Sequence, residues 1–68
     1  MNISLLDKGF RIVSKFSIGN IELYSISGEK ILELRSNNCV EEVFVVPGVY
    51  VLKIVNTEKK VIIRKLLI

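Results

Sequence analysis

The chain has 68 residues, half of them hydrophobic, and ten Lys and Arg against seven Asp and Glu give it a net charge of +3. Ten Ile, nine Val and eight Leu stand beside no Ala and no Trp, and because Ala is the best helix former while β-branched residues favour strands, this composition argues against a helical bundle. The length allows one domain, residues 1–68, which buries only roughly 60% of the surface that its unfolded form exposes.

The first half of the sequence alternates short apolar segments with turn residues, a spacing typical of a sandwich or small barrel. The strands predicted there are Ile3–Leu6, Phe10–Phe16, Ile21–Ile26 and Lys30–Arg35. In the second strand Phe10 and Ile12 share one face, and in the third Ile21 and Leu23 lie opposite Glu22 and Tyr24. Ser27-Gly28 is expected to join the third and fourth strands as a β-hairpin, because Gly supplies the positive φ that primed hairpin turns require.

The second half is predicted to hold three more strands: Val40–Val46, Val49–Val55 and Lys60–Ile68. Pro47-Gly48 between the first two is expected to form a type II turn, in which Gly48 takes the positive φ of the third position. In Val49–Val55 one face is predicted to carry Tyr50, Leu52 and Ile54. The last strand is apolar on both faces, which suits a strand covered on two sides or one that needs a partner.

The organisation predicted from these segments is a meander of hairpins. Six or seven short antiparallel strands are best packed as two sheets or a small barrel, because hydrophobic edges invite pairing unless they are closed or covered. The basic residues form no dense tract, so a solvated strand face is favoured over a nucleic-acid footprint.

The sequence offers little for catalysis or metal binding. It has no His, the commonest general base and metal ligand, and its one Cys, Cys39, cannot form an internal disulfide. Glu41 and Glu42 are neighbours, so on a strand they face opposite sides, and a solvated strand start is the expected role for both. We therefore expect a protein without catalytic residues, cofactor or metal.

We expect neither an export signal nor a membrane span in this sequence. Met1–Leu6 carries no basic segment and no apolar run of signal-peptide length, and the longest apolar runs are far below the roughly 20 residues that cross a bilayer. We expect no membrane insertion. Two alternatives stay open: a cytoplasmic protein, or the excised tail of a longer secreted one.

Three segments resemble the C-terminal sorting domain of the type IX (Por) secretion system: Ile21–Ile31, Val46–Ile54 and Val61–Ile68. That family has an apolar-Tyr strand that runs into a Gly turn, a Gly-x-Tyr strand start, and a last strand with a Lys near its end. The positions here that match these motifs are Tyr24, Gly28, Gly48, Tyr50 and Lys65. The likeness covers Ile21–Ile68, and the Asn-Pro segment that usually opens the family is absent.

The resemblance implies an immunoglobulin-like β-sandwich of about seven strands that acts as a non-catalytic sorting signal. Outer-membrane secretion machinery would recognise it, and its cargo would reach the cell surface or the extracellular space. An extended partner could add to the edge of such a domain, since backbone hydrogen bonds give affinity and alternate side chains give specificity. We expect the recognised surface to combine Lys60–Ile68 with the strand Gly48–Ile54. No nucleic acid or small-molecule substrate is expected.

Three other interpretations compete with a sorting signal. Residue by residue, a structural role is favoured: glycines in turns, Tyr50 as a core or corner aromatic, and Lys65 as a solvated side chain. A structural sandwich that forms a homodimer through an apolar edge is one alternative function. The other is a nucleic-acid-binding barrel, in which Lys8–Val13 and Val43–Val45 would supply exposed rings such as Phe10 for base stacking.

Overall fold

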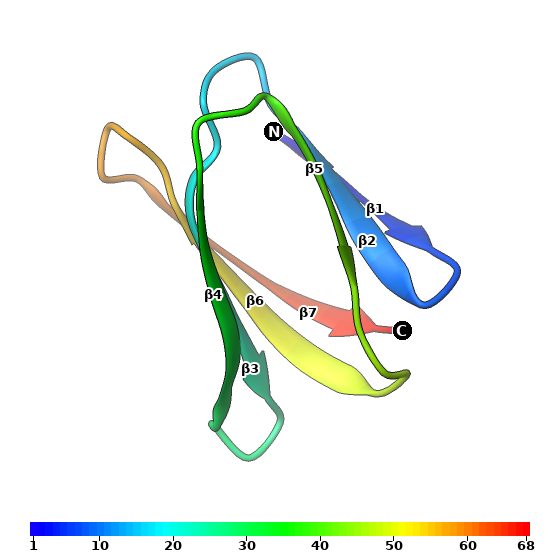
Figure 1. Cartoon of the computed structure of the whole chain (residues 1–68). Helices are drawn as coiled ribbons and strands as arrows, with labels where there is room; N and C mark the ends of the chain where they lie inside the picture. The colour runs from blue at the N-terminus through cyan, green and yellow to red at the C-terminus, as the bar shows by residue number, and fades with distance from the viewer.

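In the computed structural model, which describes residues 1–68, the chain forms seven strands in two antiparallel sheets and no helix (Figure 1). The strands are β1 (Asn2–Leu6), β2 (Gly9–Val13), β3 (Gly19–Ser25), β4 (Lys30–Ser36), β5 (Val40–Phe44), β6 (Val49–Val55) and β7 (Val61–Leu67). One sheet has the order β1-β2-β5 and the other the order β4-β3-β6-β7. The small antiparallel β-sandwich predicted from the sequence is confirmed.

The chain changes sheet three times, between β2 and β3, between β4 and β5, and between β5 and β6. Only β1–β2, β3–β4 and β6–β7 are hairpins, so the predicted meander is wrong. In strand letters the two sheets read A-B-E and C′-C-F-G, an arrangement of immunoglobulin-like sandwiches. The sheets stay open, and β1, β5, β4 and β7 are edge strands.

The core lies between the two sheets and is built from alternate residues of each strand. Seven side chains are fully buried: Phe10, Ile12, Ile18, Ile21, Leu23, Leu52 and Ile54. The predicted sharing of one face is therefore confirmed for Phe10 and Ile12 on β2, for Ile21 and Leu23 on β3, and for Tyr50, Leu52 and Ile54 on β6, and these faces lie inward. Ile18 lies in the crossing from β2 to β3, in a segment that the sequence predicted only as a break, and its burial fixes this crossing against the core.

Several strand boundaries differ from those predicted, mostly where the chain changes sheet. The strand predicted over Phe10–Phe16 ends at Val13, and Phe16 is 74% exposed because the chain has left the sheet there. The strand predicted over Val40–Val46 ends at Phe44. β3 begins at Gly19, and β4 extends to Ser36, both inside segments that were predicted as connections.

The positive φ predicted for Gly28 is confirmed and that predicted for Gly48 is wrong. The turn at Gly28 is not a primed one, because Gly28 N bonds to Ser25 O and neither residue between them has a positive φ. Gly28 has a φ of +94°, as the β3–β4 hairpin requires, whereas Gly48 is absent from the residues with positive φ. Gly48 instead exchanges two backbone hydrogen bonds with Ile68: its N donates to Ile68 O at 3.0 Å and its O accepts from Ile68 N at 2.9 Å. It therefore extends the β6–β7 ladder by one pair.

Candidate interaction surface on β6 and β7

The last strand, β7, lies at the edge of the four-stranded sheet and is paired only with β6. Along an antiparallel ladder, every second residue of a strand forms backbone hydrogen bonds with the residue opposite. Gly48 bonds to Ile68, and Asn56 N bonds to Lys60 O, so in β7 it is the even-numbered residues that bond to β6. The backbone groups that face away from β6 belong to Val61, Ile63, Lys65 and Leu67. The one side-chain hydrogen bond on this free edge runs from Arg64 Nη1 to Ile63 O, at 3.2 Å.

The outer face of β7 is apolar and uncovered. Val61 is 53% exposed, Ile63 59% and Leu67 71%, whereas the inner face carries the buried Leu66 and the half-buried Ile62. The sequence left two possibilities for this strand, and the first of them, that both of its faces are covered, is therefore wrong. On β6 the same outer face continues with three half-buried valines and one lysine: Val49, Val51, Lys53 and Val55.

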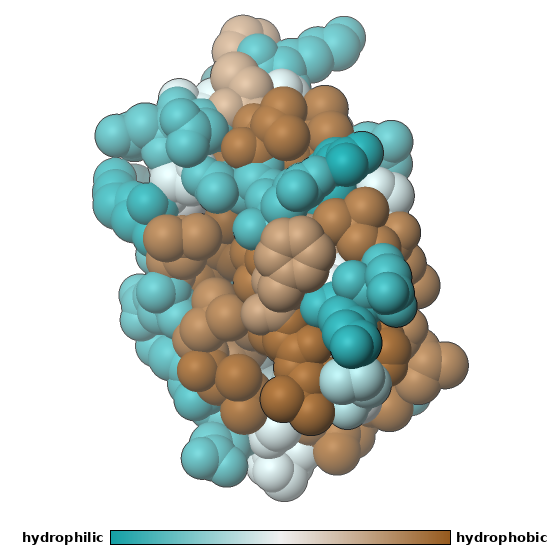
Figure 2. Space-filling view, turned by 45° about the vertical axis from the view of Figure 1, so that its right-hand side comes forward, coloured by the Kyte–Doolittle hydropathy of each residue, from teal (hydrophilic) through white to brown (hydrophobic).

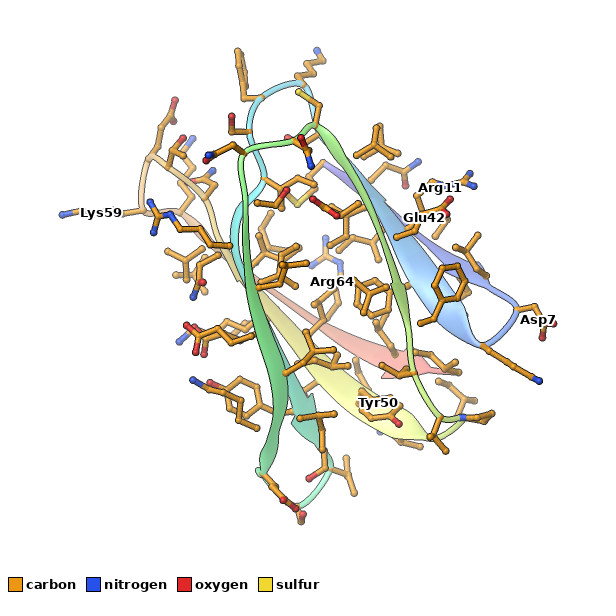
Figure 3. All side chains as sticks on the ribbon, viewed as in Figure 1. Asp7, Arg11, Glu42, Tyr50, Lys59 and Arg64 are labelled. Carbon is orange, nitrogen blue, oxygen red and sulfur yellow. The ribbon has the colours of Figure 1, made fainter.

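Beside this face, a groove of about 360 Å³ separates β7 from β1 on the open side of the sandwich. Six of its nine lining residues are hydrophobic, among them Ile3, Leu5 and Leu66. Arg64 also lines the groove, and Figure 3 shows its side chain between the two sheets. No carboxylate lies within ion-pair distance of Arg64 or Lys65, so this edge carries two uncompensated positive charges.

Of the five predicted recognition residues, the structure brings Tyr24 and Lys65 to one outer face. Tyr24 is paired with Val51 and Val51 with Lys65, so the three form a row across β3, β6 and β7. Two strand spacings separate Tyr24 from Lys65, roughly 10 Å. Gly28 and Gly48 lie in the backbone at the same end of the sheet, and Tyr50 points to the opposite, inner face.

Tyr50 and Gly48 form a structural corner where the chain passes from β5 to β6. Tyr50 is 9% exposed and its hydroxyl donates to the carbonyl oxygen of Val46, four residues earlier. A tyrosine near the start of strand F that bonds back to the upstream backbone is the tyrosine corner of immunoglobulin-like domains. A Cβ at Gly48 would lie 3.6 Å from the Tyr50 ring. Tyr50 is therefore held inside the fold and does not present its ring to a partner.

Tyr24 belongs to a polar network on the outer face of β3 and β4. Its hydroxyl donates to Glu22, and that hydrogen bond, with partial burial, raises the pKa of Tyr24. Asn20 Nδ2 donates to Glu22 Oε2 at 2.9 Å, and Lys30 Nζ donates to Glu33 Oε1 at 2.9 Å. The hydrogen bond to Glu33 raises the pKa of Lys30, and it also lowers the pKa of the Glu33 carboxyl. On this half of the sheet Lys30 lies within ion-pair distance of both Glu22 and Glu33, whereas Arg64 and Lys65 on β7 have no such partner.

The two neighbouring glutamates of β5 face opposite sides, as predicted; the expected solvated strand start is right for Glu42, which is exposed, and wrong for Glu41. Glu42 Oε2 binds Arg11 on the outer face, 2.6 Å from Nη2 and 2.7 Å from Nε (Figure 3). Glu41 is half-buried and accepts hydrogen bonds from Ser36 and Asn38, which lower the pKa of its carboxyl. These partners were not predicted: Arg11 lies 31 residues from Glu42 in the chain, and Ser36 and Asn38 reach Glu41 only through the course of the β4–β5 connection.

β5 provides a second open edge, which the sequence did not predict. The bonds from Ser14 N to Cys39 O and from Val45 N to Lys8 O set the ladder with β2, so Val40, Glu42 and Phe44 direct their backbone groups to the free edge. Val40 is 50% exposed and Phe44 63%. Figure 2 turns the side of the molecule with β1, β2 and β5 toward the viewer, and apolar side chains cover much of the face that is seen.

The rings singled out for base stacking are arranged differently from that expectation. β2 and β5 are adjacent, with Phe10 paired to Val43, but Phe10 is fully buried in the core and only Phe44 is exposed. Phe10 is therefore not available to stack on a base, which removes the main residue of that alternative.

No group of three or more His, Cys, Asp or Glu side chains is placed to hold a metal ion. With no helix in the fold, no helical segment is long and apolar enough to span a membrane. No protein-family model matches the chain, and no curated protein matches it.

Proposed function

We propose that this domain is a non-catalytic sorting signal, recognised by the outer-membrane machinery of type IX secretion for export and surface attachment of a cargo protein. The observation that carries the proposal is the free edge of β7, with its uncovered apolar outer face, at the segment where the sequence resembles the last motif of that family. The row of Tyr24, Val51 and Lys65 adds a tyrosine and a lysine from two motifs to the same face.

Recognition would proceed by strand addition to β7. The unpaired backbone groups on this edge supply the hydrogen bonds, while Ile63 and Leu67 supply apolar contacts on the outer face. Lys65, without an acidic partner in the domain, would select a segment with a carboxylate opposite it. Gly28, Gly48 and Tyr50 would act through the fold, by shaping the two turns beside this face.

The experiment is a fusion of residues 1–68 to an exported reporter in a bacterium with type IX machinery, followed by measurement of the reporter at the surface and in the periplasm. Deleting the last strand is a poor test, because Leu66 is 6% exposed and its loss would damage the core. The substitution Ile63→Lys changes only an outer-face side chain. We expect it to retain the reporter in the periplasm, whereas Arg35→Glu on β4 should leave export unchanged.

Unchanged surface display of the Ile63→Lys fusion, with the domain shown to be folded by circular dichroism, would refute recognition through β7. Equal retention of both variants would point to general loss of the domain and would also count against the proposal.

A second candidate function is an interaction module that associates with further copies of itself. The specific observation in its favour is that β5 and β7 are both open edges with exposed apolar residues. The solution mass of the isolated domain separates this function from that of a sorting signal read as a monomer.

A further inference from the structure

The four edges of the sandwich are not equally protected against pairing. The outer face of β4 carries Lys30, Glu33 and Arg35, and a register shift interrupts the β3–β4 ladder. The outer face of β1 begins with the polar residues Asn2 and Ser4. Charges, polar side chains and bulges are the usual means of blunting an edge. β5 and β7 have less of this protection, because each carries one charge on its outer face, Glu42 and Lys65, among apolar residues.

The two less protected edges, β5 and β7, are complementary in sequence when they run antiparallel. With Glu42 of one copy opposite Lys65 of another, Val40 lies opposite Leu67 and Phe44 opposite Ile63. These are the residues of each strand whose backbone groups face the free edge, so this register also aligns the available donors and acceptors. Beyond β5, Val46, which is 77% exposed, falls opposite Val61.

We propose that copies of this domain associate head to tail, with β5 of one copy paired antiparallel to β7 of the next in the register that places Glu42 opposite Lys65. The proposal uses the same free edge as the proposed sorting function but does not depend on secretion. It joins β1-β2-β5 of one copy to β7-β6-β3-β4 of the next as one continuous sheet.

The charges favour this pairing over pairing of identical edges. When the β7 strands of two copies pair antiparallel, with all four edge-facing residues of each strand opposite a partner, Arg64 of one copy lies opposite Arg64 of the other. If β5 pairs with itself about its centre, Glu42 lies opposite Glu42. Like charges directly opposite are destabilising, whereas opposite charges stabilise a cross-strand pair. Glu42 has the capacity for a second partner, since its ion pair with Arg11 uses Oε2 and leaves Oε1 free.

The second layer of the sandwich supports the same contact. When β5 meets β7 of the next copy in one layer, β4 meets β1 of that copy in the other layer. Leu34 on β4 and Leu5 on β1 lie on the inward faces of their strands and are still 38% and 55% exposed, because the sides of the sandwich are open. Head-to-tail association would cover both leucines, so it hides apolar surface in both layers.

The test is the mass of the 68-residue chain in solution, measured by sedimentation velocity from roughly 10 μM to 1 mM, a range suited to a small interface. Because a head-to-tail contact leaves an open β5 and an open β7 at the ends, the mean mass should rise past two copies and continue to rise. Either single reversal, Glu42→Lys or Lys65→Glu, should weaken association by roughly tenfold. The control Lys15→Glu, in the β2–β3 crossing, should leave it unchanged.

Charge exchange then gives a result that aggregation cannot imitate. An equimolar mixture of the two single variants should regain association, because β5 of each variant then meets a β7 of opposite charge on the other variant. The double variant should regain association by itself. A monomer at every concentration, a mass that stops at two copies, or no recovery in the mixture would overturn the proposal. In the export assay Glu42→Lys should leave sorting intact, so the failure of one proposal is distinguishable from the failure of the other.

Discussion

Gly19 and Gly28 provide a matched pair for testing why this chain needs glycine in its turns. Both have nearly the same φ, +100° and +94°, so replacement by Ala places a side chain in the left-handed region at each. The surroundings differ: a Cβ at Gly19 would lie 2.4 Å from Val55 O and 2.8 Å from Asn56 Cα, whereas a Cβ at Gly28 meets no atom within 4 Å. The difference between the two variants isolates the steric contact from the backbone cost.

The magnitudes follow from those distances. A non-glycine residue in the left-handed region costs about 1–2 kcal/mol, and restricting the unfolded chain returns about 0.4–1 kcal/mol, so Gly28→Ala should lose about 1 kcal/mol. Gly19→Ala adds overpacking against the β6 backbone, about 1–3 kcal/mol more. For a domain of this size, 1 kcal/mol corresponds to about 4–8 °C in Tm. Gly19→Ala should therefore melt about 10 °C below Gly28→Ala.

The assay is thermal and urea unfolding of both variants, monitored by circular dichroism. Equal losses of stability would refute the steric argument at Gly19, and a larger loss at Gly28 would refute the assignment of open space around its turn. The Gly28 result also bears on the sorting motif. If Gly28→Ala keeps most of its stability but abolishes export, that glycine does more than shape the β3–β4 turn.

Three further predictions concern single side chains. Tyr50→Phe removes the hydroxyl that donates to Val46 O, and the free energy of unfolding from urea titration should fall by about 1 kcal/mol with no change in export; an unchanged midpoint would contradict the corner. Lys59 has a φ of 64°, so Lys59→Gly should raise the unfolding free energy by up to about 1 kcal/mol, while Lys60→Gly should not. Ser36 and Asn38 lower the pKa of Glu41. The stability that the Glu41 carboxylate provides is therefore present above its ordinary pKa and is lost as the pH falls through the lowered pKa. Unfolding midpoints measured between pH 6 and 3 should fall less steeply for Glu41→Gln than for the unchanged domain, and parallel curves would contradict this.

The sequence was sufficient to predict which residues share a face of a strand, because a period of two is a local property. Tyr50, Leu52 and Ile54 share one face of β6 as expected, and that face lies against the core. The partners of each strand are not a local property, and the predicted meander failed there: β3 pairs with β6, which follows it only after two changes of sheet. Ile18 was missed for the same reason, since its burial depends on where the crossing passes.

The sequence indicated one of the two open apolar edges, β7, and not the other, β5. For a strand with apolar residues on both sides the sequence left two possibilities, cover on two sides or the need for a partner, and the exposed outer face of β7 excludes the first. The open edge of β5 could not be predicted, because Val40–Phe44 becomes an edge only through the order β1-β2-β5. Glu42 was expected to be solvated, and its ion pair with Arg11 arises from the β2–β5 register.

The exposed apolar residues of this domain are concentrated where backbone groups are also unpaired, and this coincidence gives them a physical meaning. A scattered exposed Ile or Val is normal in a small protein, and a chain of this size has little apolar surface to spare from its core. On β5 and β7 the exposed residues alternate along edges that offer hydrogen bonds at the same positions. An extended partner satisfies both at once, and the opposite charges of Glu42 and Lys65 determine which strand fits which edge.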